Sequence, residues 1–148
     1  DLAGPCIDVV DIGTGKLYTS SPSVAYLDLI GGGSLADGWY IEDGSNGPTG
    51  SFYKTRINGA DAICELYNTL NFQGRSNWYI PQSQTLKDDL FGTYGNMFTA
   101  RGWPAGFTYW SDTYNANGVN IYIVRLNTGC IINGVVDGSA YASCASDN

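Results

Sequence analysis

Four cysteines are the residues of this 148-residue sequence whose chemistry is easiest to define. They are Cys6, Cys64, Cys130 and Cys144, and no two form the closely spaced pair that structural zinc sites and redox motifs need. Widely separated cysteines in even number favour disulfides formed in an oxidising, extracellular compartment. We therefore expect two disulfides. Three pairings are open, and spacing alone does not choose among them.

Other residue types exclude most catalytic chemistry. The sequence has no histidine, which excludes Ser–His–Asp and Cys–His catalysis, His-ligated zinc and a histidine pH switch. Glycoside hydrolysis needs two carboxylates flanking a cleft. The only glutamates are Glu42 and Glu65, and the neighbouring Asp88 and Asp89 point away from the apolar stripe of their expected helix. Nothing singles out a catalytic pair, so we expect a protein that is not an enzyme and needs no cofactor.

The charge and composition of the sequence exclude several classes of binding partner. Fourteen acidic residues against seven basic ones give a net charge of −7, which excludes the basic patch that nucleic-acid binding requires. With 43% hydrophobic and 14% aromatic residues, the chain is expected to fold as one domain, 1–148. No apolar run approaches the ~20 residues of a membrane span, so we expect no direct membrane insertion. The chain begins at Asp1 without a leader, which is typical of a mature or excised segment, and residues 1–15 are a candidate junction with a preceding domain.

Two helices and several short strands must position these residues. Apolar residues at helical spacing predict one helix from about Asn58, with Ala60, Ile63, Cys64, Tyr67 and Leu70 on its buried face. A second helix is expected from the cap Ser83, with Leu86, Leu90 and Tyr94 as its apolar stripe. An apolar stretch at 7–12 precedes a Gly-Thr-Gly turn, and short strands are expected at 16–19, 39–41, 51–55 and 77–80. A short helix is expected to start at Ser-Pro-Ser, 21–23.

The last third of the chain is expected to be β. Residues 95–118 show no periodic pattern and predict a long aromatic loop. Three strands are expected after it, at 119–127, 130–136 and 139–145, as an antiparallel meander. The dipeptide Asp137-Gly138 favours a type I′ hairpin between the last two. The predicted class is α+β.

The order and spacing of several short motifs resemble one protein family. Ala-Asp-Ala-Ile-Cys at 60–64 precedes Asn-Trp-Tyr-Ile-Pro at 77–81, Tyr-Trp-Ser-Asp-Thr at 109–113, a Leu-Asn-x-Gly turn at 126–129 and Tyr-Ala-Ser-Cys at 141–144. This pattern resembles the C-type-lectin-like domain of invasin- and intimin-type bacterial outer-membrane adhesins and related surface proteins. The likeness covers about 85 residues of the sequence. Four positions depart from the family pattern: Ile80, Gln82, Thr85 and Asp112.

The resemblance implies a disulfide pairing. In that fold a disulfide joins the first helix to the last strand, which implies a bond between Cys64 and Cys144 and leaves Cys6 for Cys130. The sequence itself offers a rival, Cys130 with Cys144, because a turn centred on 137–138 would place those two nearly opposite each other.

The resemblance also implies a binding face. Sugar-binding C-type lectins hold calcium with a Glu-Pro-Asn or Gln-Pro-Asp loop and a Trp-Asn-Asp strand, and this sequence has neither, so we expect no metal site. The face implied by the family fold is the loop before the closing strands. Its composition suits an interface, because Trp, Tyr and Arg dominate binding hot spots. The expected contact residues are Arg101, Trp103, Phe107, Tyr114, Asn115 and Asn117. A second candidate surface is the loop between residues 31 and 50, with the acidic Asp37, Glu42 and Asp43.

These expectations combine into one functional hypothesis. The chain is expected to be the receptor-binding tip of an adhesin on the bacterial cell surface, a virulence-associated outer-membrane protein, which recognises a host cell-surface protein or glycoprotein without calcium. One alternative is a carbohydrate-binding lectin domain, in which aromatic rings stack on a glycan. Another is a structural cap of a surface fibre, with no host ligand.

Overall fold

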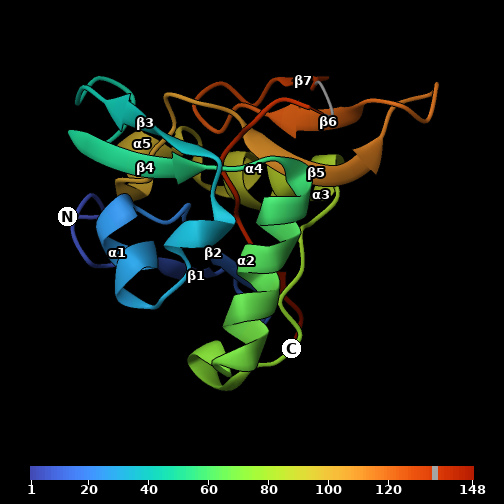
Figure 1. Ribbon diagram of the computed structural model, residues 1–148. Coiled ribbons are helices and arrows are strands. Elements are labelled where there is room, and N and C mark those ends of the chain that lie inside the picture. Colours follow the sequence, from blue (N-terminus) through green and yellow to red (C-terminus); the bar gives the residue numbers. More distant parts are fainter. Residues whose placement is uncertain (135–136) are drawn as a thin grey trace.

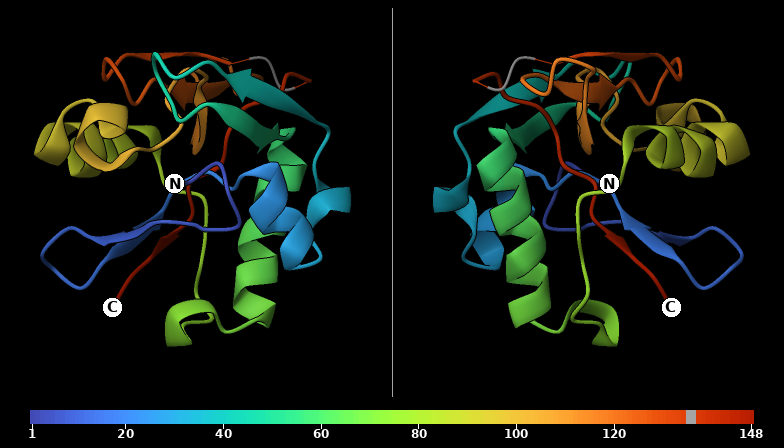
Figure 2. Two further views of the ribbon diagram at one scale, coloured as in Figure 1. Left: turned by 90° about the vertical axis from the view of Figure 1, so that its left-hand side faces the viewer. Right: turned by 90° about the vertical axis from the view of Figure 1, so that its right-hand side faces the viewer.

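The structure, a computed structural model, describes residues 1–134 and 137–148. Three small antiparallel sheets and the longest helix lie around the C-terminal segment, which runs through the middle of the molecule (Figures 1 and 2). Among the described residues, no helix is long and apolar enough to cross a membrane.

Each sheet has two or three short strands. The first has the order β1-β2-β8, the second is the ribbon β3-β4, and the third has the order β5-β6-β7. The bounds are β1 Val9–Asp11, β2 Leu17–Thr19, β3 Gly38–Glu42, β4 Gly50–Lys54, β5 Tyr109–Tyr114, β6 Ile121–Val124, β7 Ile131–Asn133 and β8 Ala145–Ser146.

The helices are short except for one. The α-helices are α1 Val24–Leu29, α2 Ile57–Thr69, α3 Ser83–Leu86, α4 Gly92–Tyr94 and α5 Met97–Arg101. A π-helical turn, η3 Lys87–Phe91, joins α3 to α4, and two short 3-10 turns are η1 Gly33–Leu35 and η2 Phe72–Gly74. The predicted second helix is thus α3, η3 and α4 in succession.

Helix α2 carries the buried face that its sequence predicts, with two differences. Ala60, Ile63, Cys64 and Tyr67 are buried, but Leu70 is about half exposed because the helix ends at Thr69 and Leu70 caps it. The N-cap is Arg56, two residues before the expected Asn58. Cys64 therefore points into the core from the middle of the longest helix.

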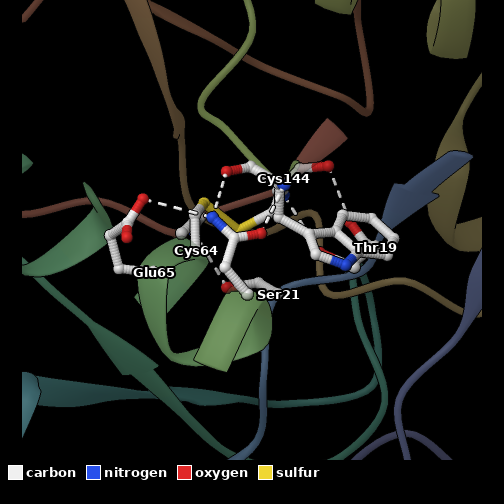
Figure 3. The surroundings of a disulfide bond; sticks show 9 residues. Thr19, Ser21, Cys64, Glu65 and Cys144 are labelled. Carbon is white, nitrogen blue, oxygen red and sulfur yellow. Dashed lines mark hydrogen bonds between the residues drawn. A yellow bond between two sulfur atoms is a disulfide. The ribbon is translucent and has the colours of Figure 1, made fainter. Parts of the chain in front are cut away.

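One disulfide joins Cys64 to Cys144, across 80 residues of sequence (Figure 3). The expected bond between Cys6 and Cys130 is wrong, and so is the rival between Cys130 and Cys144. Cys6 and Cys130 are both exposed and unpaired. They belong to different parts of the fold, since Cys6 precedes β1 of the first sheet and Cys130 precedes β7 of the third.

The predicted closing meander is also wrong in its order. The third sheet takes its extra strand from Tyr109–Tyr114, inside the segment expected to be irregular, and α5 lies in the same segment. Instead of following β7, the segment 139–145 places Tyr141 beside Tyr109 of β5 in a parallel bridge, and its last residue begins β8, which pairs with β2. The expected strand 130–136 includes two residues outside those that the structure describes, and its described part forms β7.

Residues 140–146 are completely buried and pair with several segments instead of one. Ala140 exchanges two main-chain hydrogen bonds with Thr55, and Ala145 exchanges two with Tyr79. Between them, the backbone N–H of Cys144 donates to the Thr19 hydroxyl at 3.0 Å. Apart from Tyr141, residues 140–146 are alanine, serine or cysteine, small side chains that suit close packing in the core.

We predict that the Cys64→Ala, Cys144→Ala double variant is about 4 kcal/mol less stable, because opening a link of this length restores the chain entropy of the unfolded state. Denaturant unfolding under non-reducing conditions measures this. The matched control is Cys6→Ser with Cys130→Ser, which leaves the free energy of unfolding within about 0.5 kcal/mol, as expected for exposed positions. Equal losses in both variants would contradict the assigned pairing.

Candidate functional site

Two of the predicted contact residues, Arg101 and Trp103, bind the partly buried carboxylate of Asp8. Trp103 is completely buried in the core. Its indole N–H donates to Oδ2 of Asp8 at 2.8 Å, and the Arg101 guanidinium holds the same carboxylate through Nε at 2.6 Å and Nη2 at 2.9 Å. The expectation that Trp103 contacts a partner is therefore wrong. A forked Arg101 already paired with Asp8 is also a poor donor to a second carboxylate.

The Asp8 carboxylate is held in its charged form. Burial by itself raises the pKa of Asp8, but the hydrogen bonds from Arg101 and Trp103 and the positive charge of Arg101 outweigh it, so that the pKa lies below its usual value. This pairing ties the segment before β1 to the end of α5, across more than 90 residues of sequence.

Phe107 is partly buried and supports the core. Its ring lies 5.2 Å from that of Tyr40 and 5.7 Å from that of Tyr141, measured between centroids, and the ammonium of Lys54 lies 5.6 Å from its centroid. The inner face of the β3-β4 ribbon therefore covers most of this residue. Phe107 acts as a packing residue between that ribbon and the C-terminal segment.

The other three predicted residues lie together at the β5–β6 hairpin. Tyr114, at the end of β5, is 56% exposed, and Val119 in the following loop is 61% exposed. This loop projects beyond the rest of the molecule on the right of Figure 1. Sequence reasoning missed Val119, although a valine between Gly and Asn in a polar turn is a signal that could have identified it.

Asn115 and Asn117 shape this loop. The Asn115 side-chain oxygen accepts from the backbone N–H of Asn117 at 3.2 Å, and the Asn117 oxygen accepts from Val119 at 2.8 Å. The Asn115 backbone N–H also donates to the Asn120 carbonyl at 2.8 Å. Such side-chain turns fix a loop without secondary structure. The two asparagines therefore position Tyr114 and Val119, and the amide of the exposed Asn117 faces solvent.

Of the three acidic residues predicted for the second surface, one is buried and two are exposed. Glu42 is buried, and its Oε2 accepts from the Tyr141 hydroxyl at 2.8 Å and from the backbone N–H of Gly106 at 2.9 Å. The expectation that Glu42 is part of an acidic surface is wrong, because alternation along β3 turns its side chain inward. Asp37 and Asp43, just outside the strand ends, are exposed as expected.

A polar cleft of about 360 Å³ lies near the C-terminus and was not foreseen from the sequence. Its lining residues are Lys16, Tyr79, Ile80, Pro81, Gln82, Thr85, Asp112 and Asp147. The Lys16 ammonium lies 3.4 Å from Asp89, and the Tyr79 hydroxyl donates to Asp147 at 2.9 Å. Partial burial and this carboxylate raise the pKa of Tyr79 to about 12, which keeps its hydroxyl protonated at neutral pH. The cleft thus offers hydroxyl, amide and carboxylate groups beside an exposed aromatic ring.

Comparison with solved structures finds a similar fold in a bacterial adhesin. The chain superposes on part of the Yersinia pseudotuberculosis adhesin InvE with a TM-score of 0.65 and 20% sequence identity. The match covers 93% of this chain and 33% of that chain, so the sequence spans about a third of the length of its structural neighbour. No protein-family model matches the sequence. A comparison with curated proteins also finds no match.

We predict that Asp8→Asn destabilises the chain in a pH-dependent manner. A carboxyl group with a lowered pKa in the folded state stabilises the fold above its ordinary pKa of ~3.9 and loses this contribution as the pH falls through the folded value. The difference in unfolding free energy between wild type and variant is therefore full at neutral pH and shrinks in acid. Denaturant titrations at several pH values measure it.

The control is the same substitution in an Arg101→Gln background. In that background, the difference in unfolding free energy between the chain with Asp8 and its Asp8→Asn variant depends less strongly on pH. The reason is that the Arg101 guanidinium, which lowers the pKa of Asp8 by its hydrogen bonds and its charge, is absent. A difference that stays constant with pH would contradict the assigned role of Asp8.

Proposed function

We propose that the chain is a C-type-lectin-like, receptor-binding domain of a bacterial surface adhesin, and that it binds a host cell-surface protein without calcium and without catalysing a reaction. The observation that carries the proposal is the exposed pair Tyr114 and Val119 on a projecting, asparagine-ordered loop. The similar fold in InvE, an adhesin by name, supports the surface location. The disulfide from α2 to Cys144, the residue before the last strand, fits the lectin-like fold.

Rigidity is what makes this loop suitable for recognition. Each flexible side chain that becomes ordered on binding costs ~0.5–1.5 kcal/mol, so a loop already fixed by its own hydrogen bonds binds at lower cost. Asn115 is further held by Asn133 of β7, whose side-chain oxygen accepts from the Asn115 amide at 3.3 Å. A tyrosine on such a support gives a large contact area with few rotatable bonds.

We predict that Tyr114→Ser combined with Val119→Ser weakens binding of the purified chain to host cells by about tenfold or more, as expected for loss of a central aromatic anchor. Flow cytometry with labelled protein measures the binding. Because both side chains are exposed, the free energy of unfolding stays within about 0.5 kcal/mol of wild type.

Leu70→Ser is the matched control for that experiment. Leu70 is 49% exposed at the C-terminal end of α2, at the bottom of Figure 1 and far from the β5–β6 loop. Its replacement removes the same kind of surface and leaves binding unchanged. Equal binding by the hairpin variant and the wild type would show that the receptor site lies elsewhere.

The cleft supports a second candidate function, carbohydrate binding. Tyr79 provides an aromatic ring, and Gln82, Thr85 and Asp112 provide the polar groups that bind sugar hydroxyls. A glycan array probed in the presence and absence of a chelator distinguishes the two functions. The protein-receptor proposal predicts no glycan-specific signal under either condition. A signal that Tyr79→Ala removes would favour the lectin function, and its loss on chelation would add a calcium requirement.

A further inference from the structure

Strand β3 forms an open edge of the β3-β4 ribbon. Its five residues pair with β4 in continuous antiparallel register, from Gly38 opposite Lys54 to Glu42 opposite Gly50. On its far side, β4 is covered, since the Tyr53 N–H donates to the Pro22 carbonyl at 3.2 Å and Thr55 pairs with Ala140. Within residues 1–134 and 137–148, no main-chain hydrogen bond links residues 38–42 to any segment other than β4. Open edges of this kind are templates for a further strand.

The solvent face of this ribbon is apolar. Trp39 is 59% exposed and Ile41 is 65% exposed, two residues apart on the same face of β3. Their partners across the ribbon, Tyr53 and Ser51, add a partly exposed aromatic ring and a hydroxyl. Tyr40, between them, faces the core and packs on Phe107 and Tyr141. An added strand would therefore place every second side chain beside Trp39 and Ile41, and aromatic and β-branched residues pair favourably across strands.

Acidic residues flank β3 at both ends and limit which strand can pair with its open edge. Asp37 immediately precedes the strand and Asp43 immediately follows it, and both are exposed. Asp37 accepts a hydrogen bond from the Arg56 backbone and Asp43 from Ser45, but the described residues give neither carboxylate an ion pair.

This charge pattern disfavours pairing between two copies of the chain. If two β3 strands paired antiparallel about Tyr40, Asp37 of each would lie opposite Asp43 of the other. Like charges directly opposite each other destabilise a strand pair. A strand with basic residues at its ends would instead place an opposite charge at each acidic position.

From the open edge, its exposed Trp39 and Ile41 and its acidic ends, we propose that β3 binds an extended segment of a partner protein by strand addition, and that this segment has alternating apolar residues between basic ends. Main-chain hydrogen bonds supply the affinity in this mode, and the alternate side chains and end charges supply the specificity. This site is separate from the β5–β6 loop and does not depend on the function proposed for that loop.

Trp39 provides a direct reporter of this site. The other three tryptophans, Trp78, Trp103 and Trp110, are at most 2% exposed. Acrylamide quenching of the intrinsic fluorescence therefore measures the accessibility of Trp39. Two synthetic peptides serve as probes, both N-acetylated and C-amidated: a basic-ended Lys-Thr-Val-Thr-Val-Thr-Lys and an acidic-ended Glu-Thr-Val-Thr-Val-Thr-Glu, whose valines lie beside Trp39 and Ile41 when the ends lie opposite Asp37 and Asp43.

The proposal predicts that the basic-ended peptide protects Trp39 from quenching and binds about tenfold more tightly than the acidic-ended one, since two end pairs change from attraction to repulsion. The Asp37→Lys, Asp43→Lys variant reverses this preference. Because both positions are exposed, circular dichroism of this variant matches that of the wild type. The Tyr114→Ser, Val119→Ser variant of the hairpin keeps the wild-type preference, which separates this test from that of the receptor site.

Four outcomes would overturn the proposal. Absence of protection by either peptide would show that the edge does not accept a strand. Equal protection by both, or a preference unchanged by the charge reversal, would show that the acidic ends do not select the partner. Protection of Trp39 that rises with protein concentration alone, with a dimer in sedimentation, would identify a second copy as the occupant.

Discussion

Burial of the segment 140–146 is the constraint on which the other elements of this fold depend. Its backbone hydrogen bonds reach Thr55 after β4, Thr108 before β5, Thr19 in β2 and Tyr79 before α3, so each sheet and both halves of the chain contact the same strip. A polar backbone can be buried there only because these partners satisfy it. The disulfide at Cys144 adds a covalent tie from this strip to α2 (Figure 3). Both proposed surfaces are therefore supported by one buried strip.

The sequence predicted correctly those elements whose formation depends on residues close together in the chain. The buried face of α2, the two strands of the β3-β4 ribbon and the cap at Ser23 follow from periodicity and turn chemistry. The link between Cys64 and Cys144 followed from a family resemblance, not from spacing. What failed was long-range pairing: the place of 139–145 between sheets, and the free state of Cys6 and Cys130, depend on contacts between segments far apart in sequence, which no local pattern encodes.

The candidate site shows the same division. The exposure of Tyr114 and Asn117 could be predicted, because a polar segment without a periodic pattern lies at the surface. Trp103 and Arg101 could not, because their environment is set by Asp8, more than 90 residues earlier in the chain. An arginine and a tryptophan near a loop have the composition of a binding hot spot, but the same side chains equally suit a partly buried carboxylate that needs hydrogen-bond donors.

A high aromatic content does not by itself indicate a binding surface, because most of these rings fill the core. Only the aromatic residues that stay exposed indicate where a partner could bind. The chain carries few charged residues, and its core is filled with large rings whose polar atoms are satisfied inside: the Trp110 indole donates to the Thr55 carbonyl, and the Tyr141 hydroxyl to Glu42. Among the residues that the structure describes, three aromatic side chains are exposed: Trp39, Tyr79 and Tyr114. They lie on three different features: the ribbon edge, the polar cleft and the hairpin loop. Burial of each of these rings would be favourable, because it removes apolar surface from water. A partner that covers one of these three surfaces would therefore gain binding free energy from the ring that it buries.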